Sequence, residues 1–234
     1  MDMRHLTHPF ERVMLGVGSI LKYANYNSVV WGAGFMNNHD TTKARNIIAV
    51  RGCLSASKVR EGGGGKIKGD PALLLPTLLP APHPRETDCE VGFIPHWSEF
   101  DNFALQIFPE MDPSIINSSR IIDFRTTDID ATINKILNCR MILSSSLHGI
   151  IIAHAYGIPA LWFRNAAGNT NPFKYNDYFS SVNIPQYEAI DITDIQKANL
   201  EDIRNLFQRM ALQSIPTQTT IVSIQKDLID TFPY

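Results

Sequence analysis

Serine, histidine and glycine residues come together in one short segment that could bind an anion. Residues 141–149 read MILSSSLHG, in which an apolar run is followed by three serines and then by Leu-His-Gly. If the run is a strand and a helix begins near Ser146, the first N–H groups and the dipole of that helix favour a phosphate or carboxylate. Ser145 and Ser146 could donate to this anion, and Gly149 would let it approach the backbone. An ordinary N-cap and a hydrogen-bonded helical His148 explain the same pattern, and local physics leaves both interpretations open.

Two residues outside this segment also suit anionic or acid–base chemistry. Arg51 follows an apolar run, and its planar donor fork matches a carboxylate or phosphate, although a surface arginine paired with a carboxylate is the alternative. His96 follows a run and a proline, and it could act as general acid or base or donate to phosphate. His154 lies in an apolar helical pattern, where core packing is the better explanation. Weaker candidates, for which turn, ion-pair or core roles are commoner, are Asp70, Arg125, Trp31 and Trp97.

Apolar runs that alternate with helical patterns must position these residues. Runs that are apolar on both faces are typical of parallel strands covered by helices, so the alternation predicts an α/β fold with right-handed crossovers. The expected strands are Val13–Leu21, Ser28–Phe35, Asn46–Gly52, Glu90–His96, Arg140–Ser144 and Ile158–Phe163, with strand-like runs in Ser114–Phe124. The expected helices are Leu54–Arg60, Ser98–Phe108, Asp128–Asn138, Ser146–Gly157, Asp194–Leu212 and Thr219–Ile229.

A proline-rich passage predicts the boundary between two domains. Prolines recur through residues 76–84, where neither a helix interior nor a central strand tolerates them. We therefore expect an amino-terminal Rossmann-like domain over residues 1–84 and a second over 85–234. The four glycines at 62–65 are best explained as a loop, because no Gly-Lys-Ser/Thr follows to complete a phosphate cradle.

Composition narrows the class of protein further. The chain has 234 residues, 44% of them hydrophobic, and a net charge of −2, so a buried core is expected and a nucleic-acid-binding face is not. Its three cysteines are scattered and predict reduced thiols, with neither a disulfide framework nor a zinc site. No cluster of His and Cys ligands indicates a metal. The polar start and the broken apolar stretch Ile150–Phe163 predict a cytoplasmic protein without a signal peptide or transmembrane segment.

Several motifs together resemble the polysaccharide pyruvyl transferase family. Its hallmark is Ser-(Arg or Ser)-Leu-His-Gly, an apolar helix and then Gly-Ile-Pro, which here are residues 145–149 and 157–159. The other pieces, in the family's order, are VGSIL (17–21), WGAGF (31–35), AVRG (49–52), GDPALLLP (69–76) and IPH (94–96). The resemblance covers about residues 15–163. It implies a GT-B-like fold, in which two Rossmann-type domains with parallel sheets face each other across a cleft.

The resemblance also implies an activity and its participants. The reaction would move the pyruvyl group of phosphoenolpyruvate onto two hydroxyls of a sugar as a cyclic ketal, in exopolysaccharide, capsule or cell-wall polymer synthesis. Phosphoenolpyruvate is then the donor substrate, and no cofactor or metal is expected. The acceptor is a glycan, and the family's pathways are consistent with a lipid-linked acceptor at the inner membrane face. Expected catalytic residues are His148 and His96, and expected substrate-binding residues are Arg51, Ser145, Ser146 and Gly149.

Two departures from the family keep other functions open. Many members have arginine where this chain has Ser146, and the usual opening strand with its Asn-x-Gly-Asp loop is not found before Gly16. We therefore expect a shortened amino-terminal domain, which is either a compact variant or the result of a truncated start with an incomplete acceptor side. One alternative is a GT-B glycosyltransferase using a nucleotide sugar, with Asp177 or Glu188 contacting ribose. Another is a non-catalytic homologue that binds a glycan or a partner enzyme.

Overall fold

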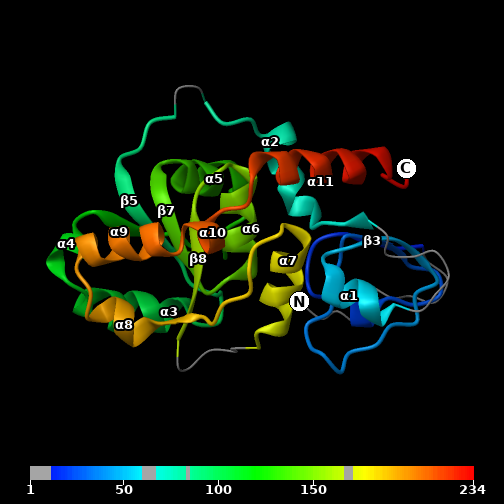
Figure 1. The fold of residues 1–234 in the computed structure, drawn as a ribbon, viewed down its shortest axis with the longest axis horizontal. Coiled ribbons are helices and arrows are strands. Elements are labelled where there is room, and N and C mark those ends of the chain that lie inside the picture. Colours follow the sequence, from blue (N-terminus) through cyan, green and yellow to red (C-terminus); the bar gives the residue numbers. More distant parts are fainter. Residues whose placement is uncertain (1–11, 60–66, 83–84, 166–170) are drawn as a thin grey trace. The chain divides into compact units, whose positions relative to one another are not determined.

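The chain forms two compact α/β units (Figure 1). The computed structural model describes residues 12–59, 67–82, 85–165 and 171–234, so the glycine run at 62–65 lies outside the described residues. Unit 1 comprises residues 1–74, 171–186 and 216–234, and unit 2 comprises residues 75–170 and 187–215. This division differs from the expected boundary at residues 84 and 85, because two later segments return to unit 1.

Unit 1 is built on a parallel sheet of four short strands. β1 (Met14–Leu15), β2 (Val29–Trp31), β3 (Asn46–Val50) and β4 (Ile67–Lys68) follow one another in sheet order, and every neighbouring pair is parallel. β1 is far shorter than the run Val13–Leu21 predicts. Gly18 has a φ of +117°, which turns the chain out of the strand. Other elements of the first segment are the 3-10 turns η2 (Leu21–Tyr23) and η3 (Pro71–Leu74) and the helix α1 (Cys53–Lys58).

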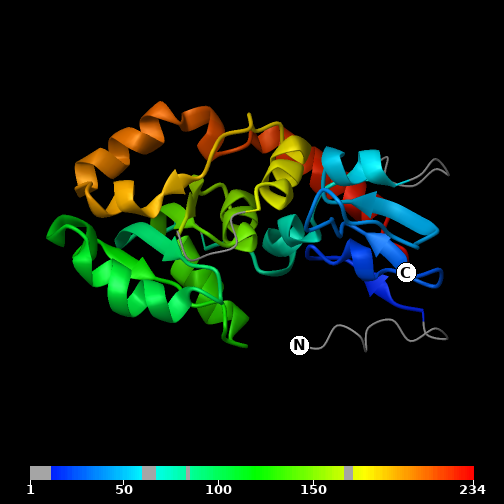
Figure 2. The ribbon, with the colours of Figure 1, turned by 90° about the horizontal axis from the view of Figure 1, so that it is seen from below.

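Two helices from the later segments complete unit 1. α7 (Phe173–Ser181) packs against α1, and α11 (Gln218–Asp230) packs against β4 and η3. Figures 1 and 2 both show α11, in red, beside the blue and cyan segments of this unit. The Trp31 indole N–H donates to the Leu228 carbonyl at 3.1 Å, and the Gln225 amide donates to Leu73 at 2.7 Å. These long-range bonds explain why the boundary between the units cannot be a single point in the sequence.

Unit 2 contains a five-stranded parallel sheet in the order β6-β5-β7-β8-β9. Its strands are β5 (Cys89–Ile94), β6 (Ser119–Ile121), β7 (Cys139–Ser144), β8 (Ala160–Arg164) and β9 (Ile190–Asp191). Its α-helices are α2 (Leu75–Leu78), α3 (Phe100–Asn102), α4 (Pro113–Ile116), α5 (Ile129–Leu137), α6 (Leu147–Ala155), α8 (Ile192–Gln196), α9 (Leu200–Arg209) and α10 (Ala211–Ser214). α3 continues into a π-helical turn η4 (Phe103–Ile107) and a 3-10 turn η5 (Phe108–Glu110). The alternating pattern of the sequence predicted this layout.

Helices cover both faces of this sheet, as continuous apolar strands require. On one face, Val91, Phe93, Leu143, Leu161 and Phe163 share a core with η4, α8 and α9. On the other face, α5 and α6 pack against β7. α5 forms where a helix was expected, but Asp128, expected as its first residue, instead caps it by accepting from the Ala131 N–H at 2.9 Å. Ile129, the first residue of α5, is exposed.

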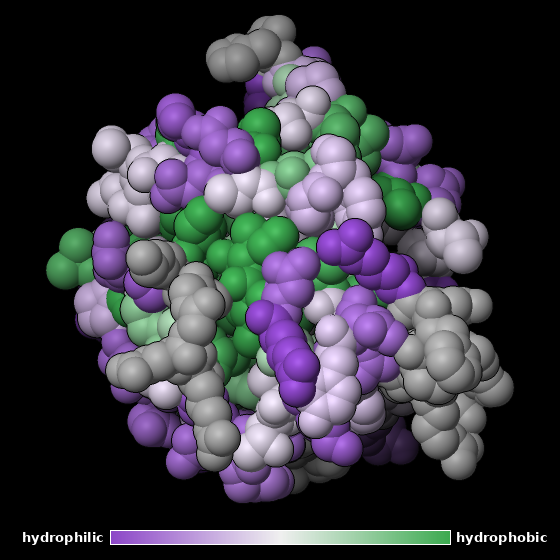
Figure 3. Space-filling model, turned by 90° about the vertical axis from the view of Figure 1, so that its right-hand side faces the viewer, coloured by the Kyte–Doolittle hydropathy of each residue, from purple (hydrophilic) through white to green (hydrophobic). Residues whose placement is uncertain are grey.

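Hydrophobic side chains gather on one face of the surface. Figure 3 shows the side that carries β3 in Figure 1, where hydrophobic side chains lie near the middle of the view with hydrophilic ones around them.

Among the described residues, no helix is both long enough and apolar enough to cross a membrane. The apolar stretch Ile150–Phe163 is divided between two elements: α6 ends at Ala155, and β8, which was expected to begin at Ile158, begins at Ala160.

Candidate functional site

The carboxyl ends of β5 and β7 bring the predicted loops together. The two strands are register partners up to Ile94 and Ser144, so the residues that follow lie at the same edge of the sheet. Ser145 donates its backbone N–H to the Ile94 carbonyl at 3.2 Å, and its hydroxyl accepts the His96 N–H at 2.9 Å. Ligands of open α/β sheets bind at this edge. The structure therefore places His96, which is 49 residues earlier in the chain, beside the serine turn.

A buried carboxylate and a buried hydroxyl support this turn, and the sequence pattern indicated neither. The Ser145 hydroxyl lies 3.2 Å from Glu99 Oε2 and donates to it. Ser144 Oγ accepts the Ser146 N–H at 3.0 Å and lies 2.8 Å from the carbonyl oxygens of both Ile94 and Ser146. Glu99 is only 7% exposed and sits in an otherwise unremarkable helical start. Its partner Ser145 lies 46 residues later, in the turn after β7, so a local pattern could not have identified it.

Ser146 stands at the N-cap of α6 without capping it. Its backbone is extended there, with φ −100° and ψ 124°, and its side chain makes no cap hydrogen bond. The ordinary N-cap interpretation would have this hydroxyl accept a helix N–H. Because it does not, the described contacts leave the amino end of α6 with the anion-binding features that the sequence suggested.

His148 and Gly149 occupy the first turn of α6. His148 is half-buried, and its Nε2 atom is buried. A Cβ at Gly149 would lie 2.4 Å from Ser144 Oγ and 2.9 Å from Ile94 Cγ2. Close packing of α6 on the ends of β5 and β7 therefore explains this glycine. The approach of a ligand to the Gly149 backbone stays a prediction.

His96 is positioned by its own loop. The ring is half-buried, and its Nδ1 atom lies 2.8 Å from Ser98 Oγ and 3.4 Å from the Ser98 N–H. Because a backbone N–H can only donate, His96 Nδ1 is the acceptor in its contact with the Ser98 N–H. The neighbouring Trp97 is 66% exposed, so it is not the core aromatic that was the commoner expectation.

Arg51 belongs to unit 1, where it is fully buried. Its Nε donates to Asp177 Oδ2 at 3.1 Å, its NH1 group to Ser19 at 2.6 Å and its NH2 group to the Phe35 carbonyl at 2.6 Å. Asp177 also accepts the Ser55 N–H at 2.7 Å. These contacts account for Arg51 as a structural residue, and its pair with a carboxylate is buried, not at the surface. They also occupy Asp177, which was one ribose candidate of the glycosyltransferase alternative.

The weaker candidates have local roles. Asp70 is buried and accepts the Ala72 N–H at 3.0 Å, as a turn residue does. Arg125 forms ion pairs with Asp123 at 2.9 Å and Asp101 at 3.0 Å, and these exposed contacts raise its pKa. The described residues contain no group of three or more His, Cys, Asp or Glu side chains placed to hold a metal ion.

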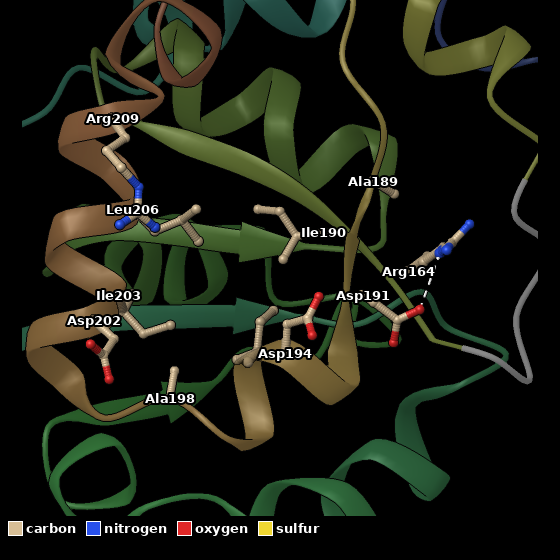
Figure 4. A pocket seen from close by; sticks show the side chains of 11 residues that line it. Arg164, Ala189, Ile190, Asp191, Asp194, Ala198, Asp202, Ile203, Leu206 and Arg209 are labelled. Carbon is tan, nitrogen blue, oxygen red and sulfur yellow. Dashed lines mark hydrogen bonds and ion pairs between the residues drawn. The ribbon is translucent and has the colours of Figure 1, made fainter.

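A separate pocket of about 500 Å³ lies in unit 2 between β9, α8 and α9 (Figure 4). Its floor is aliphatic and includes Ile190, Ile195 and Leu206. Most of its charged groups already have partners: Arg164 lies 3.3 Å from Asp191, whose Oδ1 accepts the Thr193 N–H at the start of α8. None of the predicted site residues lines this pocket. Its lining favours no single class of ligand.

The chain is an α/β protein, because each of its two units is built on a parallel sheet. At one sheet edge, the turn Ser-Ser-Leu-His-Gly leads into a helix start that is suited to bind an anion. The sequence model described as polysaccharide pyruvyl transferase matches residues 7–166 of this chain. The chain belongs to the polysaccharide pyruvyl transferase family, a family of transferases, which confirms the resemblance seen in the motifs.

Two individual relatives share about 30% sequence identity with this chain. Uncharacterized protein L143 of Acanthamoeba polyphaga mimivirus is 30% identical over an alignment of 190 residues, and the match covers 79% of this chain and 65% of that protein. The succinoglycan biosynthesis protein ExoV of Rhizobium meliloti (strain 1021) is 28% identical over an alignment of 185 residues, and the match covers 74% of this chain and 55% of that protein. The chain thus spans between about half and two thirds of the length of these relatives.

A solved structure of the wall teichoic acid polymerase TagF also shows a likeness. The TM-score is 0.30 at 12% identity, and the match covers 84% of this chain and 60% of that one. A score this low carries no argument about function.

Proposed function

We propose that this chain transfers the pyruvyl group of phosphoenolpyruvate to two hydroxyls of a glycan sugar, forming a cyclic ketal and releasing phosphate. Membership of the family supports the transferase class. The observation that carries the site assignment is the start of α6, where Ser146 leaves the cap unmade and His148 follows. The setting would be synthesis of an exopolysaccharide, capsule or cell-wall polymer.

The start of α6 is the proposed phosphate site. Its backbone N–H groups and the Ser146 hydroxyl would hold the phosphate beside His148. Ser145 would position the loops and not bind the donor directly, since its hydroxyl is engaged by His96 and Glu99. No residue of unit 1 is included in this donor site.

The reaction requires one proton donor and one proton acceptor. A proton added to the methylene carbon of phosphoenolpyruvate leaves oxocarbenium-like charge on the carbon that bears phosphate. One sugar hydroxyl attacks that carbon and loses its proton, phosphate leaves, and the second hydroxyl closes the ring and loses its own. His148 and His96 are the proposed acid and base, and the proposal does not say which of the two takes which role. No net oxidation or reduction occurs, so no redox cofactor is proposed.

Thermal unfolding in the presence of donor tests this proposal without knowledge of the acceptor. A ligand at about one hundred times its dissociation constant stabilises the folded chain by about 2.7 kcal/mol, which shifts the midpoint by several degrees. We expect phosphoenolpyruvate to raise the midpoint of the wild type and not that of His148→Ala. His39→Ala is the matched control, because the His39 side chain is 86% exposed and lies in unit 1.

The other outcomes separate the alternatives. A shift with UDP- or GDP-sugars in place of phosphoenolpyruvate would identify a glycosyltransferase. No shift with any of these compounds would contradict the donor site and favour a non-catalytic homologue. Equal shifts in wild type and His148→Ala would place phosphoenolpyruvate elsewhere.

A further inference from the structure

Two of the three cysteines lie next to each other on neighbouring strands of unit 2. Cys89 and Cys139 are the first residues of β5 and β7, and they are register partners. Partners on parallel strands point to the same face of the sheet, and the strands are about 4.8 Å apart. This spacing falls within the Cα–Cα range of disulfides, about 4.4–6.8 Å. The Cys89 thiol donates to the Val91 carbonyl at 3.3 Å, and the Cys139 thiol donates to the Lys135 carbonyl at 3.2 Å.

The surroundings of the pair distinguish the two thiols. Cys89 is 5% exposed and follows Asp88, whose carboxylate pairs with Arg120 at 2.6 Å. The neighbouring Cys139 thiol, and to a smaller extent the charge of Arg120, lower the pKa of the Cys89 thiol against the opposing effect of burial. Cys139 is fully buried, and its neighbour Cys89 and burial raise the pKa of its thiol. Because Arg120 lies beside Asp88 and Cys89, we take Cys89 as the nucleophile and Cys139 as the resolving thiol.

We infer that Cys89 and Cys139 are an oxidation site, a dithiol that closes to a disulfide across the starts of β5 and β7. The inference does not depend on the proposed transferase activity. The cysteines lie at the amino ends of β5 and β7, whereas His96 and Ser145 follow the carboxyl ends of the same strands. The sequence alone predicted only scattered reduced thiols, because the two cysteines are 50 residues apart and become neighbours through strand pairing.

The oxidant is a small hydroperoxide, since both sulfurs are buried. The Cys89 thiolate attacks one oxygen of hydrogen peroxide, the O–O bond breaks, and with one proton water leaves, giving a sulfenic acid. The Cys139 sulfur then attacks the Cys89 sulfur, loses its proton and displaces the hydroxyl as a second water. The two thiols have lost two electrons to one peroxide molecule.

Thiol counting on Cys53→Ser tests the inference without interference from the exposed third cysteine. We expect two thiols in the denatured variant before treatment with hydrogen peroxide, none after it, and two again after dithiothreitol. Trypsin should yield residues 86–120 linked to residues 136–140, a species 2 Da lighter than the two peptides together. Two thiols remaining after peroxide, or sulfinic acid without the linked peptides, would overturn the inference.

Second variants test the order of the two steps. In Cys53→Ser/Cys139→Ser, we expect Cys89 to accumulate as a sulfenic acid that dimedone traps. In Cys53→Ser/Cys89→Ser, we expect Cys139 to remain a thiol under the same conditions. If Cys139 reacted with dimedone at the rate of Cys89, the assignment of the nucleophile would be wrong. The mass of the linked peptides in the parent protein decides the pairing even if a double variant fails to fold.

Discussion

The buried pair of Arg51 and Asp177 shows how one residue's chemistry depends on its partner. Both side chains are fully buried and lie 2.9 Å apart, and the Ser19 hydroxyl and the Phe35 carbonyl accept two further guanidinium hydrogen bonds. Removing one partner would leave a buried charge without compensation, which costs more than the pair itself contributes. This pair therefore fixes α7 against the strand and loop that carry Arg51.

Arg51→Met should destabilise unit 1 strongly. Breaking a buried ion pair typically costs about 3–5 kcal/mol, whereas an exposed pair contributes about 1 kcal/mol or less. We expect urea to unfold Arg51→Met at a much lower concentration than the wild type, and the double variant Arg51→Met/Asp177→Leu to recover part of the loss. Arg125→Met is the control with exposed partners. Equal urea midpoints for Arg51→Met and Arg125→Met would refute the structural role.

At the scale of elements, the first turn of α6 is held against two strand ends. Gly149 allows this contact because it has no side chain, and Ser144, the last residue of β7, accepts a hydrogen bond from the Ser146 N–H in the turn. The position of His148 therefore depends, through packing, on a glycine one residue away.

Gly149→Ala should shift α6 away from the sheet edge. The added methyl would meet Ser144 Oγ at 2.4 Å, and overpacking of this kind costs about 1–3 kcal/mol. We expect a lower thermal midpoint and weaker binding of phosphoenolpyruvate. In Gly149→Ala/Ser144→Ala the nearest clash is gone, so the loss should be smaller than the sum of the single losses. Additive losses would show that Ser144 is not what excludes a side chain here.

At the scale of the whole molecule, His154 links folding to pH. It is 1% exposed in α6, its Nε2 lies 3.0 Å from the Ser214 carbonyl, and burial lowers its pKa to about 4. The unfolded chain, with a histidine pKa of about 6.5, binds a proton that the folded chain rejects. Stability should therefore fall as pH falls from about 6.5 to about 4.

Replacing His154 by glutamine should flatten this dependence. The histidine accounts for a loss of up to about 3 kcal/mol between neutral pH and pH 4, and glutamine does not titrate there. We expect the difference between urea midpoints at about pH 7 and about pH 4.5 to be larger in the wild type than in His154→Gln. The same difference in both proteins would mean that His154 is protonated without unfolding.

Local sequence determined the elements that place the candidate site. The strand at residues 140–144, the helix starting near 146 and the strand at 158–163 were predicted because hydrophobic period, serine turn and glycine stop all act within a few residues. The order of the motifs also determined the family. Core packing of His154 followed from its place in an apolar helix.

Tertiary structure decided which residues meet. Asp177 lies 126 positions from Arg51, and His96 lies 49 from Ser145, so no local pattern could pair them. The same holds for the return of α7 and α11 to unit 1 and for the cysteine pair. Periodicity and capping report on neighbours along the chain, whereas buried charges and close-packed glycines are satisfied by groups that only the folded chain brings within a few ångströms.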